Sequence, residues 1–142
     1  MTATRLPAAQ RRRAIVAAGL QVFSTGSYSG ATTAEIARAA GISEPILYRH
    51  FDSKRDLYFA CLEEAWQRLR EVFEARIGEF GDGNAFEAIA QTDRSLRVLT
   101  PNLWIQALTE AGEDPAIARF LRGHMREVHD YIAGVARHAQ AA

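Results

Sequence analysis

The side chains best suited to chemistry in this 142-residue chain gather in one short segment, residues 44–54. The candidates combine a phenol, an imidazole, cations and apolar groups, and they are Glu44, Pro45, Ile46, Tyr48, Arg49, His50 and Lys54. An arginine can read guanine or hold a phosphate, an isoleucine can touch a thymine methyl, and tyrosine and histidine can donate to phosphates. These residue types predict a surface that enters a DNA groove.

Two short helices joined by a glycine turn must position this segment. A capping-box spacing at Thr32 predicts a helix over about 33–40, and Gly41 ends it. Ser43 is then the predicted cap of a second helix that runs to about Phe51. A helix of about eight residues, a three-residue turn and a second short helix predict a helix-turn-helix.

Neither short helix can bury itself, so both must pack on the longer helix predicted over residues 8–25. The predicted apolar face of that helix consists of Ile15, Ala18, Val22 and Phe23. The residues expected to pack against it are Ile36, Ala37, Ile42, Leu47 and Phe51. With these side chains turned inward, the DNA candidates of the second short helix point outward.

A fourth helix is predicted over residues 54–77, opened by Ser53, and it places Lys54 at its N-terminus. Free N–H groups and the helix dipole favour an anion at that end. Two apolar stripes run along this helix, one through Tyr58, Leu62, Trp66, Leu69, Phe73 and Ile77, the other through Leu57, Cys61, Ala65 and Val72. A helix that is buried on two sides is expected to connect two cores.

The remaining segments also read as helices, so the predicted fold class is all-α. We expect a break at Gly78–Gly83, a helix over 85–99, another that starts at Thr100-Pro101, and a last one that starts at Pro115 after a break at 112–114. Strand-type alternation is absent from the pattern.

Charge and composition indicate which kinds of partner and which cell compartment suit the chain. Residues 1–55 carry a net charge of +5 and the remainder −5, although the whole chain is neutral, which suggests that the front meets a polyanion. The single cysteine, Cys61, excludes an internal disulfide, suits a reducing cytoplasm and is expected to be a small buried hydrophobe. No stretch approaches the roughly 20 apolar residues of a membrane helix, so we expect no membrane partner.

Segment 8–60 resembles the DNA-binding domain of the TetR family of bacterial transcription repressors. The residues that carry the resemblance, in order, are Ala18, Phe23, Gly26, Thr32-Thr33, Ile36-Ala37, Ala40-Gly41-Ile42-Ser43, Leu47-Tyr48, Phe51 and Lys54-x-x-Leu57. The resemblance implies a cytoplasmic, homodimeric, helix-turn-helix repressor that a small molecule releases from a double-stranded DNA operator. It divides the chain into a DNA-binding domain at 1–53 and a helical effector-binding domain at 54–142, with 54–77 as connector.

The resemblance also assigns roles. Thr33, Tyr48, His50 and Lys54 take phosphate-contact positions, whereas Glu44, Pro45, Ile46 and Arg49 take positions that face base edges. Glu44 departs from the pattern, because a neutral residue is easier to place beside DNA. It can accept from a cytosine amine, or it can turn away as a negative charge at a helix N-terminus.

An effector pocket is implied among the helices of the rear half, for an apolar or amphipathic small molecule. Its candidate residues are Trp66, Phe86, Trp104, Leu108, Phe120, His124, Val128 and Tyr131. A histidine and a tyrosine on an apolar stripe suggest a pocket with polar points. Core filling would explain most of these residues equally well, and His124 can equally be a satisfied core histidine.

Other function classes find less support. His124 and His129 are five residues apart and do not share a helix face, and we find no catalytic motif, so we expect no enzyme, metal or cofactor. The alternative is a helical interaction module or fragment that no longer binds DNA. TetR proteins usually carry two further helices that form the dimer, so we expect this chain to be truncated at its C-terminus and to dimerise poorly or by another pairing.

Overall fold

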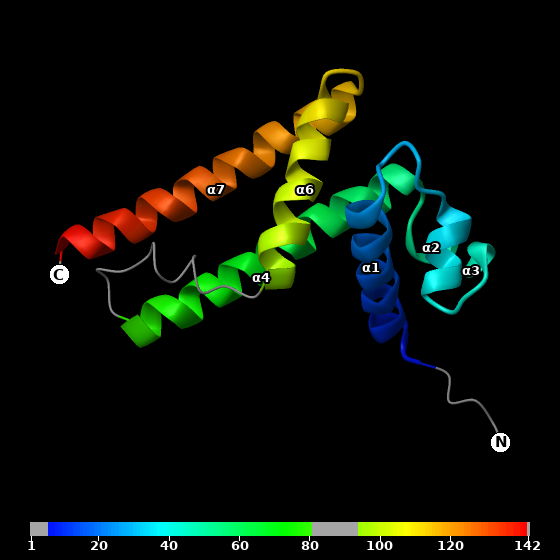
Figure 1. Cartoon of the computed structure of the whole chain (residues 1–142), viewed down its shortest axis with the longest axis horizontal. Helices are drawn as coiled ribbons and strands as arrows, with labels where there is room; N and C mark the ends of the chain where they lie inside the picture. The colour runs from blue at the N-terminus through cyan, green and yellow to red at the C-terminus, as the bar shows by residue number, and fades with distance from the viewer. Residues whose placement is uncertain (1–5, 81–93, 142) are drawn as a thin grey trace. The chain divides into compact units, whose positions relative to one another are not determined.

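The computed structural model describes residues 6–80 and 94–141, without the side chains of 76–80, 94–101 and 139. Within these residues every regular element is a helix, as the sequence predicts: α1 (Ala8–Thr25), α2 (Thr33–Ala39), α3 (Glu44–His50), α4 (Lys54–Phe80), α6 (Arg94–Ala111) and α7 (Pro115–Ala141) (Figure 1). The chain divides into two compact units, residues 1–65 and 66–142. None of the described helices has the length and apolarity to cross a membrane.

Helix α1 has the predicted bounds, but its buried face differs from the predicted one. Pro7, whose ring fixes φ, precedes the helix, and the N–H of Gly26 closes it on the carbonyl of Val22 at 3.1 Å. Val22 and Ala18, both predicted to face inward, are only half-buried. The buried positions are Ile15, Val16, Gly19, Leu20, Phe23 and Ser24. This face is turned because α1 must also pack on α4, where Gly19 approaches Cys61.

The turn between α2 and α3 follows from local signals. The Thr32 hydroxyl accepts a hydrogen bond from the N–H of Glu35 at 3.1 Å, which confirms the predicted cap of α2. Gly41 has φ +71°, a left-handed conformation that side chains with a Cβ rarely adopt. Ser43 occupies the N-cap of α3, yet its side chain makes no capping bond, so that part of the prediction is wrong.

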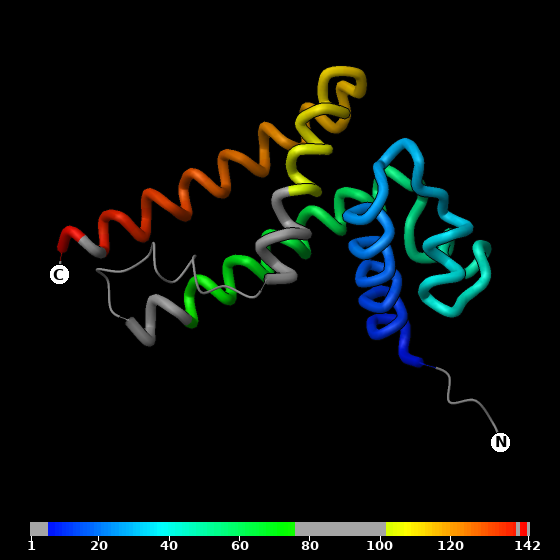
Figure 2. Tube along the Cα trace, viewed as in Figure 1, coloured from blue at the N-terminus to red at the C-terminus, as the bar shows by residue number. Residues whose placement is uncertain are grey.

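The N-terminal unit is built around α1 and the first half of α4, with α2 beside α1 and α3 beside α2 (Figure 2). Ser53 caps α4 by accepting from the N–H of Asp56 at 3.1 Å. The buried residues of α4 come from both predicted stripes, and they are Leu57, Tyr58, Cys61, Leu62 and Ala65. A helix buried on two sides at its start holds the helix-turn-helix against a continuous core.

Two predicted helix boundaries are wrong, the end of the fourth helix at residue 77 and the start of a new helix at Thr100-Pro101. Helix α4 runs to Phe80, past Gly78, because one glycine costs a helix only about 1 kcal/mol. Helix α6 runs through Thr100 and Pro101 without a boundary, although an interior proline loses one backbone hydrogen bond and costs a helix about 3 kcal/mol. The predicted helix over 85–99 lies largely outside the described residues.

The turn between α6 and α7 is at residues 112–114, as predicted. The Asp114 carboxylate accepts from the N–H of Ala116 at 2.9 Å, so that Asp114 caps α7 directly before Pro115. The two helices bury Leu103 and Ala107 of α6 together with Ile117 and Leu121 of α7. This core belongs to the C-terminal unit.

Candidate nucleic-acid interface and aromatic cluster

Helix α3 separates an inner face from an outer one. Leu47 is fully buried and Phe51, directly after the helix, is 4% exposed, whereas Tyr48 is 46% exposed. The other DNA candidates fall into two groups, with Pro45 and Arg49 exposed and Glu44, Ile46, His50 and Lys54 half-buried. The outer face therefore presents an aromatic ring and a guanidinium beside apolar side chains, which is unusual for a plain solvated helix and suits a groove.

Thr33 differs from the other candidates because it is buried and bonded within the protein. Its hydroxyl donates to the Glu44 carboxylate at 2.7 Å and lies 3.0 Å from the Tyr48 hydroxyl. The start of α2 is thereby tied to both the first turn and the middle of α3. The sequence offers two roles for Glu44, a contact to a cytosine base and a negative charge at a helix N-terminus. The bond to Thr33 is a third role, which the sequence did not predict.

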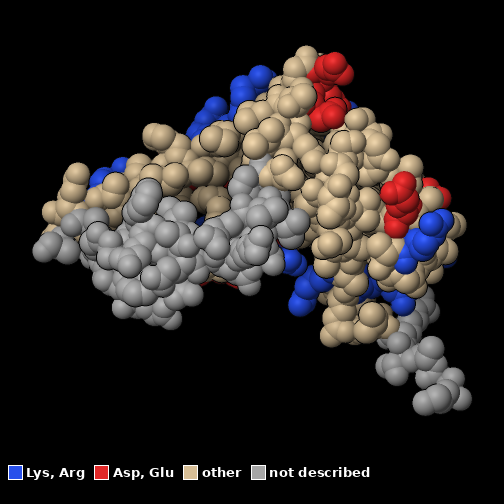
Figure 3. All heavy atoms as spheres, in the orientation of Figure 1, with Lys and Arg blue, Asp and Glu red and all other residues tan. Residues whose placement is uncertain are grey.

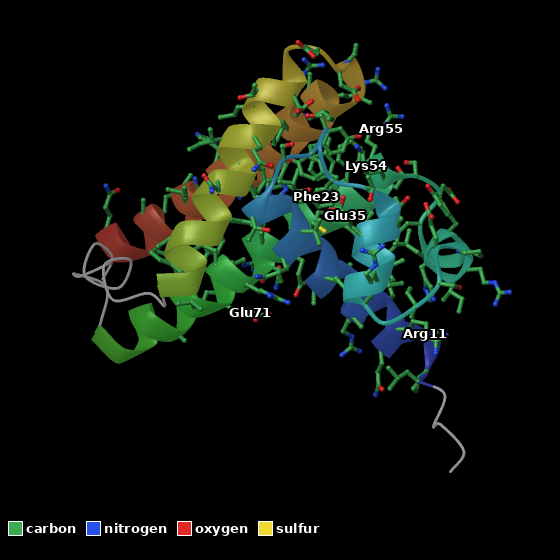
Figure 4. All side chains as sticks on the ribbon, turned by 45° about the vertical axis from the view of Figure 1, so that its right-hand side comes forward. Arg11, Phe23, Glu35, Lys54, Arg55 and Glu71 are labelled. Carbon is green, nitrogen blue, oxygen red and sulfur yellow. The ribbon has the colours of Figure 1, made fainter. Side chains whose placement is uncertain are left out.

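Lys54 is held by the loop between α1 and α2. Its ammonium donates to the backbone carbonyls of Tyr28 at 2.8 Å and Ala31 at 3.2 Å, and lies 4.5 Å from the centre of the Tyr28 ring. Tyr28 packs in turn on Tyr58, with ring centres 4.7 Å apart, and Tyr58 packs edge-on against Phe23. Figure 4 labels Lys54 and Phe23, the two ends of this series of contacts. Two backbone carbonyls and the Tyr28 ring, which itself packs on Tyr58, therefore fix the position of the Lys54 ammonium.

Sequence reasoning missed two residues of this surface. Tyr28 lies in the glycine- and serine-containing loop between α1 and α2, and an aromatic ring in such a loop is itself a packing signal. The sequence pattern does not single out Arg12, yet its guanidinium lies 4.3 Å from the centre of the Phe51 ring, beside the end of α3. Arg12 lies three residues before the buried Ile15, so the two side chains are neighbours on the surface of α1. This spacing is the sequence signal that could have pointed to Arg12.

The surface of the N-terminal unit carries cations, with acidic groups among them (Figure 3). Residues 1–55 have a net charge of +5. A basic excess beside an exposed α3 is the electrostatic footprint expected of a DNA-binding surface. No group of histidine, cysteine or carboxylate side chains within the described residues is arranged to hold a metal ion.

The C-terminal unit gathers most of its pocket candidates around His124. The ring of His124 stacks on Trp104 with centres 4.7 Å apart, and lies 5.9 Å from both Phe120 and Trp66. Tyr131 joins through Trp66 at 5.7 Å. We call these five residues the aromatic cluster.

The remaining pocket candidates lie differently. Val128 is half-buried, Leu108 is 64% exposed, and Phe86 is outside the described residues. Two residues join the edge of the cluster without having been predicted as pocket residues: Phe73, whose ring is 6.3 Å from Tyr131, and Arg70, whose guanidinium is 4.8 Å from the Tyr131 ring. Burial, followed by the nearby Glu74 carboxylate, raises the pKa of Tyr131.

Residues 15–61, which span the buried part of α1 to the first turns of α4, match the family described as bacterial regulatory proteins, tetR family. Over residues 15–61 the chain belongs to the TetR family. A crystal structure of a TetR-like transcriptional regulator from Rhodococcus sp. RHA1 is 26% identical with a TM-score of 0.70, over 95% of this chain and 72% of that one.

Two curated relatives are likewise regulators. The HTH-type transcriptional activator FasR of Mycolicibacterium smegmatis is 46% identical over 59 residues, which cover 42% of this chain and 27% of that protein. The HTH-type transcriptional regulator BetI of Cronobacter sakazakii is 25% identical over 129 residues, 87% of this chain and 64% of that protein. The chain thus spans less than two thirds of either relative, and both are transcriptional regulators rather than enzymes.

Proposed function

We propose that this TetR-family chain is a DNA-binding transcriptional regulator that holds a double-stranded operator through α3. The observation that carries the proposal is the division of α3, whose Tyr48 and Arg49 are exposed while Leu47 and Phe51 are buried. A helix anchored on one side and open on the other can enter the major groove. Because its partner is the chromosome of a bacterium, the proposed location is the cytoplasm.

The proposed roles divide into base and phosphate contacts. Arg49 reaches a base edge, and its neighbours in the groove are Pro45, Ile46 and Glu44. Tyr48, His50 and Lys54 are the proposed phosphate contacts, and buried Thr33 holds the Tyr48 hydroxyl beside them. Lys54 is the strongest of these, since its ammonium is already held at the start of α4 and keeps donor capacity beyond its two carbonyl partners.

The test is a DNA-binding titration at several salt concentrations. With about four phosphate contacts in each of two half-sites, log K should fall with log salt at a slope of roughly −7. Lys54→Ala should weaken all sequences alike, whereas Arg49→Ala should change base preference. Arg122→Ala, an exposed cation of α7, is the matched control and should leave affinity unchanged. Undiminished binding in a Tyr48→Ala, Lys54→Ala double variant would show that α3 is not the DNA surface.

We further propose that residues 66–142 bind an apolar or amphipathic effector whose binding releases the DNA, so that the regulator acts as a repressor. The aromatic cluster supports this, because stacked rings with a buried imidazole among them offer an apolar site with one polar point. Leu108, Val128 and Phe86 complete the proposed set. Effector addition should quench tryptophan fluorescence and lower DNA affinity together. Quenching that persists in full in Trp104→Phe and Trp66→Phe variants would place the effector elsewhere.

A two-fold operator needs two recognition helices about 34 Å apart, so we propose that the DNA-bound form is a homodimer. The described part of the C-terminal unit exposes several large apolar side chains that such pairing can cover, namely Ile105, Met125 and Ile132. Sedimentation with and without operator DNA tests this. A one-to-one complex of monomer and complete operator would contradict it.

A further inference from the structure

The hydrogen bonds among Thr33, Glu44 and Tyr48 determine which hydroxyl donates its hydrogen to which oxygen. Thr33 has one hydroxyl hydrogen, and it donates this hydrogen to the Glu44 carboxylate at 2.7 Å. The 3.0 Å contact between the Thr33 and Tyr48 hydroxyls then needs its hydrogen from Tyr48. The chain of donors therefore runs from Tyr48 to Thr33 to Glu44, and we call it the hydroxyl relay.

The relay has a consequence for an exposed residue of α3. Tyr48 is 46% exposed, but its only hydroxyl hydrogen points to buried Thr33, so outward it presents lone pairs alone. A DNA phosphate offers only acceptors and needs a donor from the protein. In this arrangement the exposed Tyr48 side chain can reach a phosphate, but its hydroxyl hydrogen is already donated to Thr33 and cannot bond the phosphate.

We infer that Glu44 is a positioning residue, which acts through Thr33 to hold the Tyr48 hydroxyl hydrogen inside the protein until Tyr48 leaves the relay. The inference rests on the proposed function, since it concerns how α3 meets DNA. It assigns Glu44 a role that is neither reading cytosine nor supplying charge to a helix end. DNA binding through Tyr48 then costs the protein one internal hydrogen bond, and cutting the relay removes that cost.

The test compares the loss of affinity on Tyr48→Phe in different backgrounds. Phenylalanine keeps the ring and removes only the hydroxyl. In Thr33→Val, which keeps shape and the Glu44 charge, the hydroxyl is free to donate to phosphate. Tyr48→Phe should therefore cost about fivefold more affinity in the Thr33→Val background than in the wild-type one, because wild-type Tyr48 must break one neutral internal hydrogen bond to reach the phosphate. Affinities are measured by fluorescence anisotropy on one DNA duplex at one salt concentration.

Two further backgrounds make the result specific. Thr33→Ser keeps the hydroxyl and should show the wild-type Tyr48→Phe ratio. Glu44→Ala cuts the relay at its other end, lets Thr33 donate to Tyr48, and should reproduce the Thr33→Val ratio. The lost Glu44 charge cancels because it is absent from both members of that pair. Glu44→Ala also serves if circular dichroism shows that Thr33→Val does not fold.

The failure of this inference differs from failure of the proposed function. Equal Tyr48→Phe ratios in all backgrounds, with binding still lost in the Tyr48→Ala, Lys54→Ala double variant, would overturn the relay alone. A larger ratio in the wild type than in Thr33→Val would do the same. Undiminished binding in the double variant would overturn both proposals, because α3 would then not face DNA.

Discussion

The close approach of α1 and α4 makes Gly19 the most informative position for testing the fold. A Cβ at residue 19 would lie 2.8 Å from the Cys61 sulfur and 3.5 Å from Leu57 Cδ1. The second distance is an ordinary contact, but the first is about 1 Å shorter than van der Waals packing allows. Cys61 is fully buried, so its sulfur has little room to turn away. Gly19→Ala must therefore displace the sulfur or the helix.

Two opposing effects determine the size of the change in unfolding free energy. Overpacking a core costs about 1–3 kcal/mol, whereas alanine in place of glycine stabilises a helix by about 0.5–1 kcal/mol. Gly19→Ala should therefore destabilise by about 1–2 kcal/mol. In a Cys61→Ala background the clash is gone, and the same substitution should stabilise by about 0.5–1 kcal/mol.

Denaturant unfolding, followed by circular dichroism, measures the four proteins of this double-mutant cycle: the wild type, Gly19→Ala, Cys61→Ala and the double variant. Gly123→Ala in α7 is the matched control, because a Cβ there meets nothing within 4 Å and only the helix effect remains. If Gly19→Ala stabilises the otherwise wild-type chain as much as Gly123→Ala does, the close approach of α1 to α4 is wrong. A destabilisation that survives in the Cys61→Ala background would assign the clash to another atom.

Three further changes test other parts of the structure. Lys54→Met, which keeps the stem and removes the ammonium, should lower the unfolding free energy by about 1–2 kcal/mol, since two carbonyl contacts are lost; no change in the denaturation midpoint would contradict these bonds. Gly41→Ala should cost about 1 kcal/mol through its positive φ, and Gly41→Asn less; equal midpoints would refute the left-handed turn. Because the folded chain raises the pKa of Tyr131 through burial, it favours the neutral phenol, and stability should fall as pH rises above about 10. Tyr131→Phe should remove that slope, and a slope that persists would belong to another group.

The sequence by itself determined the elements whose signals lie within a few residues of one another. The bounds of α1, the Thr32 cap, the left-handed Gly41 and the turn at 112–114 all depend on neighbours along the chain. The alternation of buried Leu47 and exposed Tyr48 follows from helical periodicity once α3 is placed. Local signals also misled, since Gly78 and Pro101 weaken a helix without ending it.

Only the tertiary structure decided which partner each functional side chain meets. Lys54 bonds a carbonyl 26 residues away, and the ring of His124 stacks on Trp104 of another helix. The buried face of α1 was likewise set by the close packing of Gly19 against α4, which no periodicity within α1 reveals. Thr33, Glu44 and Tyr48 have local patterns that suit DNA contacts, yet their hydroxyls and carboxylate bond to one another. Hydrogen bonds and ring contacts form between atoms a few ångströms apart in space, so their partners depend on how the helices pack and not on spacing along the chain.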